Sequence, residues 1–211
     1  MDLVLGLWDL VVHLDRHLEL FVAQHGAWVY GLLFLIVFCE TGLVVAPFLP
    51  GDSLLFVAGA IAAVGGMQVF VLAGALVAAA LCGDNVNYWV GRWIGPKVFH
   101  YRESRWLNPA YLQRAHAFYE RHGGKTIILA RFVPIVRTYA PFVAGIGRMP
   151  YGRYLAYCVG GAVLWVSSMC AAGYFFGNIA FVRANLTLVV LGIVLLSVSP
   201  ALVAWLRARF S

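Results

Sequence analysis

The stretch Ala46-Pro47-Phe48-Leu49-Pro50-Gly51-Asp52-Ser53 stands between two apolar segments and decides how the chain can fold. Its two prolines and its glycine cannot continue a helix. The apolar run that follows, residues 54–64, ends at Gly65 and Gly66. At about 1.5 Å of rise per residue, so short a run falls well short of a hydrocarbon core about 30 Å thick. The pattern predicts a re-entrant loop over residues 40–65.

The composition places this loop in a membrane protein. Of 211 residues, 63% are hydrophobic and only 11% are charged, whereas a soluble domain is typically about a quarter charged. The net charge of +6 fits cytoplasmic loops rich in Lys and Arg. We therefore expect no nucleic-acid partner.

A second broken segment lies at residues 126–147. It is apolar, yet it contains two arginines, Arg131 and Arg137, and two prolines, Pro134 and Pro141. Such residues exclude a simple lipid-exposed span. Basic residues flank the segment on both sides, and the positive-inside rule assigns both flanks to the cytoplasm. We expect a second re-entrant loop here, entering from the cytoplasmic face and opposed to the first.

The remaining chain predicts an all-α integral membrane protein that forms one domain over residues 1–211. Residues 1–25 are expected to form an amphipathic helix at the interface. Residues 92–125 are expected to form a basic cytoplasmic loop, and both termini are expected in the cytoplasm. About four transmembrane helices are expected, over residues 27–45, 67–93, 154–176 and 186–206.

An internal repeat supports the two opposed loops. Phe48-Leu49-Pro50 is followed by Phe56-Val57-Ala58-Gly59, and Phe132-Val133-Pro134 is followed by Phe142-Val143-Ala144-Gly145. The spacing within the two copies differs by two residues. The pattern indicates an inverted repeat whose broken helices meet near the midplane, where transporters place their binding sites.

Four charged residues in or beside these apolar segments require compensation: Glu40, Asp52, Arg131 and Arg137. Each costs about 2.5–3.5 kcal/mol at the centre of a membrane helix, so carboxylates and guanidiniums are natural partners if the loops face each other. Helix N–H groups freed at the proline breaks, with two arginines nearby, favour an anion such as phosphate. Burial favours the protonated carboxyl and the arginines favour the ionised one. Such a group could couple proton movement to substrate movement.

Structural interpretations stay open beside this one. Asp52 could be the N-cap of the helix that follows it, and Glu40 could lie in water at the outer interface. The two arginines could be structural ion-pair partners, or could extend to the inner face. Asp84 and Arg92 lie on one side of a helix and form a candidate ion pair that serves packing.

These motifs resemble the bacterial DedA family. Glu40-Thr41-Gly42 and Pro50-Gly51-Asp52 resemble the first half of its signature, and Arg131-Phe132-x-Pro134-x-x-Arg137 with Ala144-Gly145 resembles the second. Gly83-Asp84 through Tyr88 and Gly91-Arg92 match the pattern between them. The resemblance implies a bacterial inner-membrane protein related to the VTT-domain scramblases.

The resemblance also implies a function. Members of the family are assigned to flipping undecaprenyl phosphate and depend on the proton motive force. Arg131 and Arg137 would then bind phosphate, while Glu40 and Asp52 would bind protons or gate. Supporting residues would be Pro50, Gly51, Asp84, Arg92, Pro134, Tyr139 and Gly145.

The leading hypothesis is therefore a flippase of a polyprenyl phosphate or a related phospholipid, with membrane lipids and protons as partners. The alternative is a proton-coupled transporter of a small ion or solute. A lipid phosphatase would need a nucleophile with a base, but the loops contain no His and Ser53 has no evident base, so we expect no enzyme. No cofactor or metal is expected, since His100, His116 and His122 lack ligand spacing. Glycine-rich helices would allow a homodimer.

Overall fold

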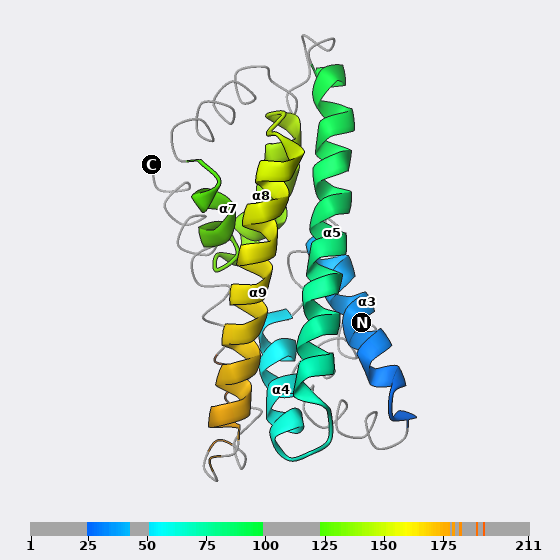
Figure 1. Cartoon of the computed structure of the whole chain (residues 1–211), viewed down its shortest axis with the longest axis vertical. Helices are drawn as coiled ribbons and strands as arrows, with labels where there is room; N and C mark the ends of the chain where they lie inside the picture. Colours follow the sequence, from blue (N-terminus) through cyan, green and yellow to red (C-terminus); the bar gives the residue numbers. More distant parts are fainter. Residues whose placement is uncertain are drawn as a thin grey trace, which may run out of the picture. The chain divides into compact units, whose positions relative to one another are not determined.

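The computed structural model describes residues 25–42, 51–98 and 123–177, with single positions at 179, 182, 189 and 192. Within these ranges the chain is all helical and contains no strand, as the sequence predicts (Figure 1). The expected interfacial helix 1–25, most of the basic loop 92–125 and the expected helix 186–206 lie outside the described residues. The helices are α3 (Trp28–Gly42), α4 (Gly51–Ala63), α5 (Val69–Val98), α7 (Lys125–Ala130), α8 (Pro134–Ile146) and α9 (Tyr151–Phe176).

Among the described residues, two helices are long and apolar enough to cross a bilayer. They are Val69–Ile94 within α5 and Tyr151–Phe176, which is α9, and each exceeds the roughly 20 residues that a crossing needs. Only 33% of the most apolar stretch of each helix is buried, whereas the core helix of a soluble protein is mostly buried. The exposed faces are apolar, including the stripe of Val86, Trp89, Val90 and Trp93 on α5. Such surfaces suit contact with lipid.

The short helices begin and end near the proline- and glycine-rich stretches, although α4 begins three residues before the apolar run predicted over residues 54–64. Helix α4 begins at Gly51 and ends at Ala63, just before Gly65, whose φ of 83° a helix cannot accommodate. It is buried along its length except at Asp52 and Ala63, as expected for a helix that is apolar all round. Helix α3 is described as far as Gly42, so its predicted continuation to Val45 lies outside the described residues.

The chain divides into two compact units. Unit 1 comprises residues 1–36, 49–76 and 166–211, and unit 2 comprises residues 37–48 and 77–165. Helices α3, α5 and α9 each pass from one unit into the other. The units are therefore interleaved along the chain, and each is described by itself.

In unit 1, helices α4 and α9 approach each other backbone to backbone through two glycines. A Cβ atom on Gly59 of α4 would overlap the backbone of Cys170, and one on Gly173 of α9 would overlap the backbone of Phe56. Each helix thus offers a glycine to the backbone of the other. Small residues at such positions are typical of helix packing in membranes.

Unit 2 contains the same reciprocal contact between α8 and α5. A Cβ atom on Gly145 would overlap the carbonyl of Tyr88, and one on Gly91 would overlap the carbonyl of Phe142. The residues on the short helices are the ones that repeat in the sequence. On the long helices, Tyr88 and Cys170 stand at the same position counted from the first residues of α5 and α9. The sequence repeat is therefore also a repeat in packing.

The second broken segment is interrupted once. Helix α7 ends at Ala130 and α8 begins at Pro134, with Val133 extended at φ −116° and ψ 105°. The expectation that Pro141 also interrupts the helix is wrong, since α8 continues through it to Ile146. Proline removes a single backbone donor, and α8 is hydrogen-bonded at both of its ends, Arg137 N to Val133 O at 2.9 Å and Gly147 N to Val143 O at 2.8 Å.

Alanine substitutions test the repeated contact. We expect Gly59→Ala and Gly145→Ala to lower the midpoint of thermal unfolding in detergent by about 3–10 °C, because overpacking costs roughly 1–3 kcal/mol. Gly74→Ala is the matched control, since a Cβ there meets no atom within 4 Å; its midpoint should stay level or rise. Equal midpoints for all three variants would show that the helices do not depend on this close approach.

Candidate functional site: a buried cluster of charges

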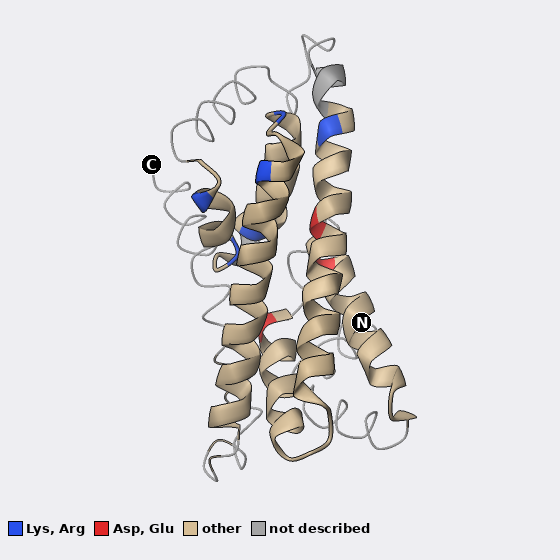
Figure 2. Ribbon diagram, viewed as in Figure 1, with Lys and Arg blue, Asp and Glu red and all other residues tan. Residues whose placement is uncertain are grey.

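Few of the described residues are charged (Figure 2), and unit 2 buries four of these. Glu40 lies on α3, Asp84 on α5, Arg131 at the break after α7, and Arg137 on α8. Their exposed fractions are 0%, 3%, 5% and 7%. Charges this deeply buried must be paired.

Arg137 forms an ion pair with Glu40, its NH2 group donating to Oε1. The guanidinium carbon also lies 4.9 Å from the ring centroid of Trp165 on α9, a cation–π contact. The predicted association of a first-loop carboxylate with a second-loop arginine is confirmed for this pair. The alternative that placed Glu40 in water at the interface is wrong, because its side chain is fully buried.

Arg131 forms the second ion pair, with Asp84. The thiol of Cys158 on α9 donates to Asp84 Oδ2 at 3.1 Å, and Arg131 NH2 lies 3.4 Å from the Cys158 carbonyl. The expected pair of Asp84 with Arg92 is wrong, and Arg92 donates instead to the Tyr88 hydroxyl at 3.2 Å. Eight residues separate Asp84 from Arg92 along the helix, about 12 Å, which is too far for an ion pair.

Both arginines therefore lie in buried pairs, and the alternative in which they extend to the inner face is wrong. The alternative in which they are structural partners remains open. Asp52 lies in the first turn of α4 in unit 1, after Gly51, and not at the cap position. There it complements the positive end of the helix dipole. In unit 2 the carboxylate that pairs with Arg131 is that of Asp84.

Asn87 on α5 joins this cluster and was not singled out in the sequence. Its side chain is fully buried. Nδ2 donates to the backbone carbonyl of Thr41 at 3.3 Å and to that of Thr138 at 2.6 Å. A Cβ on Gly42 would lie 3.1 Å from the Cα of Gly83, so α3 and α5 are already close here. The available signal was a polar residue in an apolar helix, three residues after Asp84 and one of two asparagines there.

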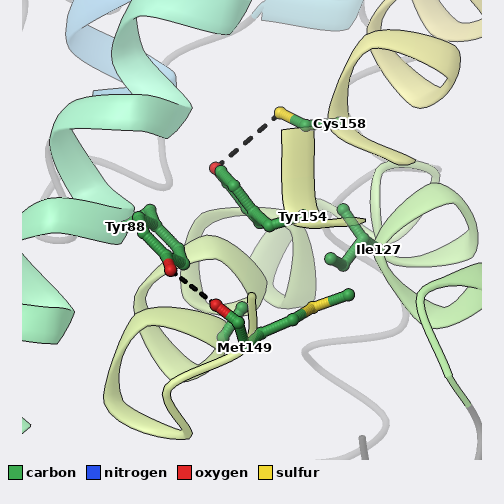
Figure 3. Packing of buried hydrophobic residues seen from close by; sticks show 6 residues of the cluster. Tyr88, Ile127, Met149, Tyr154 and Cys158 are labelled. Carbon is green, nitrogen blue, oxygen red and sulfur yellow. Dashed lines mark hydrogen bonds between the residues drawn. The ribbon is translucent and has the colours of Figure 1, made fainter. Parts of the chain in front are cut away.

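Tyr88 and Tyr154 form an aromatic layer that packs with Ile127, Met149 and Cys158 (Figure 3). The rings of Tyr88 and Tyr154 stack with centroids 4.3 Å apart. The Tyr88 hydroxyl donates to the Met149 carbonyl at 2.6 Å, and the Tyr154 hydroxyl donates to the Asp84 carbonyl at 2.8 Å. The layer shields the Asp84–Arg131 pair from solvent, which strengthens the electrostatic interaction within it.

The supporting residues implied by the family resemblance have different surroundings. Gly145 contacts the backbone of α5, and Arg92 is half-buried. Tyr139 is 44% exposed and contributes no buried group to the charge cluster. Pro134 begins α8 and Gly51 begins α4. Pro50 and the three histidines considered as metal ligands, His100, His116 and His122, lie outside the described residues.

Long helices with apolar exposed faces are consistent with a membrane protein. The VTT domain model matches residues 49–175, and the chain belongs to this family, which includes DedA. Protein DedA of Escherichia coli K12 is 54% identical, with 99% of this chain and 96% of that protein covered. An uncharacterized membrane protein of Mycobacterium leprae is 46% identical, with coverages of 80% and 76%. Inner membrane protein YghB of E. coli K12 is 36% identical, with coverages of 87% and 82%. No solved structure matches the chain.

A double-mutant cycle on Asp84 and Arg131 tests the second pair. Asp84→Asn alone strands a buried guanidinium, and Arg131→Gln alone strands a carboxylate; each should cost about 3–5 kcal/mol. The double variant should cost clearly less than the sum, because neither charge is then left alone. The measurement is the free energy of unfolding of each variant, obtained with denaturant in detergent. Additive losses would mean that the two residues do not form a pair.

Proposed function

We propose that the chain carries a lipid phosphate, a polyprenyl phosphate such as undecaprenyl phosphate or a related phospholipid, across the bacterial cytoplasmic membrane. The observation that supports this is the burial of two arginines at and just beyond a helix break, where each forms an ion pair with a carboxylate. Buried charges in membrane proteins mark substrate and ion pathways. Guanidiniums bind phosphate and carboxylate oxygens with the same geometry. Undecaprenyl phosphate is the substrate that the family resemblance implies.

The two ion pairs suggest how transport would be driven. A phosphate can take the guanidinium of Arg137 only if Glu40 gives it up, and Glu40 gives it up when it binds a proton. One proton would then enter with each negative charge of the phosphate, so that the net charge of the site would stay constant. The same exchange applies to Arg131 and Asp84. Asp52 is a further proton-binding or gating residue on the resemblance, and its role stays a prediction.

The proposed role is binding and release without bond cleavage. The charge cluster offers guanidinium groups, which can bind a phosphate, and carboxylates, which can bind a proton. The thiol beside them, that of Cys158, is hydrogen-bonded to Asp84. We therefore propose a transporter and not an enzyme, with the lipid's apolar tail remaining among the membrane lipids.

The proposed topology has two opposed re-entrant loops, about four spanning helices and both termini in the cytoplasm, in one membrane domain. Helices α4 and α8 each contain 13 residues, about 20 Å, which is too short to cross. Their repeated contact with a long helix supports the inverted repeat. Transporters of this kind place the site between broken helices. A homodimer is compatible with this arrangement.

Transport of a labelled polyprenyl phosphate in proteoliposomes tests the proposal. Under an imposed pH gradient, we expect Arg137→Gln to reduce uptake by about 10- to 100-fold, since a charge-assisted hydrogen bond is lost. Glu40→Gln should uncouple uptake from the gradient, because the site can no longer exchange a proton there. Arg153→Gln is the matched control, because Arg153 is exposed on α9; it should transport like wild type.

Two outcomes would count against the lipid phosphate. If folded wild-type protein moves no polyprenyl phosphate, that substrate is rejected, and the same vesicles are tested for proton-coupled flux of small ions and solutes. If Arg153→Gln and Arg137→Gln lose the same share of transport, the buried arginine has no special role.

A further inference from the structure

Asn87 makes a connection that the ion pairs do not. Its single amide nitrogen donates to two backbone carbonyls on two different helices, Thr41 of α3 and Thr138 of α8. Thr41 directly follows Glu40, and Thr138 directly follows Arg137. The amide therefore joins the backbone of α3 to that of α8 at the positions next to both members of the first ion pair.

The burial of this amide is not what packing alone would select. Asn87 is fully buried, and its Oδ1 has no hydrogen-bond partner among the described residues. A buried acceptor left unsatisfied costs stability, and an apolar side chain of similar size would avoid that cost. The groups that make asparagine useful here are the two N–H donors.

The neighbouring helices present two backbone carbonyls to these donors, and only an amide can donate to both. The close approach of α3 and α5 at Gly42 and Gly83 leaves the Thr41 carbonyl within reach of a short side chain. Serine has one donor, and aspartate when ionised has none. Only a primary amide of this length donates two hydrogen bonds from a single atom.

We infer that Asn87 is a positioning residue: it clamps α3 to α8 so that Glu40 and Arg137 meet. It acts through that pair and touches no substrate in this scheme. The inference deepens the proposed function, on which its consequence for transport rests. The clamp itself is a property of the folded chain and is measured without substrate.

A double-mutant cycle with Glu40 tests the clamp. Asn87→Asp keeps the shape, removes both donors and adds a negative charge beside the ion pair. At neutral pH it should lower the thermal midpoint in detergent by about 3–10 °C. In the Glu40→Gln background, the decrease in thermal midpoint should be smaller by at least half, because the introduced carboxylate no longer shares Arg137 with Glu40. Asn85→Asp is the same change two residues away. It should lower the thermal midpoint equally in both backgrounds, since Asn85 is hydrogen-bonded to Leu81 and Tyr151.

The pH dependence gives a second readout. Acidification protonates the introduced carboxyl and restores one donor, so the deficit of Asn87→Asp against wild type should shrink from about pH 8 to pH 5. The pH optimum of lipid-phosphate transport should move down in the same variant. Equal midpoint losses in both backgrounds, together with a deficit that does not change with pH, would overturn the clamp.

A third variant covers the case in which Asn87→Asp does not fold. Asn87→Ser can donate to at most one of the two carbonyls, so the backbone amides of residues 135–140 and 142–146 should exchange hydrogen faster than in wild type, while Asn85→Ser leaves them unchanged. Exchange equal to wild type in Asn87→Ser overturns the inference. If the wild-type protein moves no lipid phosphate, the proposed function is rejected. The clamp is still tested by the double-mutant cycle and by hydrogen exchange, because neither measurement uses a substrate.

Discussion

The burial of two guanidinium–carboxylate pairs is the constraint on which unit 2 depends. An arginine in a low-dielectric interior needs its counter-charge in contact, so the segments that carry Arg131 and Arg137 must lie against α5 and α3. A buried pair adds little stability compared with apolar residues of the same volume, yet losing one partner is strongly destabilising. Two such pairs in one small unit are therefore an expensive way to hold helices together, and that cost favours a role beyond packing.

Glycine contacts make these pairs geometrically attainable. Lipid gives helices no hydrophobic reason to associate, so close backbone approach has to supply the packing energy. Gly91 and Gly145 bring α5 and α8 together, and Gly161 lets the Arg131 side chain lie against α9, where a Cβ would stand 3.0 Å from the arginine Cδ. The same reciprocal arrangement recurs in unit 1 around Gly59 and Gly173. The repeat thus preserves a packing geometry, whereas the paired charges described here belong to unit 2.

The sequence predicts the features that local chemistry controls and misses those that depend on helix rotation. Proline and glycine mark the start of α4 and the break before Pro134, because they act on their own backbone. Pro141 misleads, since one lost donor does not end a helix whose other bonds remain. Charge alone predicts that Glu40 needs an arginine. It cannot tell that Asp84 faces Arg131, which depends on how α5 is turned, and hydrogen bonds from Asn87 to backbone carbonyls leave no pattern in the residues they reach.

Pairing also determines what an incoming phosphate meets. Each guanidinium is already matched, so the four charged groups sum to zero, and a phosphate that entered alone would add an uncompensated negative charge to a buried site. A proton taken up by Glu40 or Asp84 offsets one negative charge of the phosphate and frees one arginine. A site of unpaired arginines would instead hold phosphate too tightly to release it. On the proposed function, the carboxylates are therefore competitors of the substrate, and they make both its binding and its release conditional on a proton.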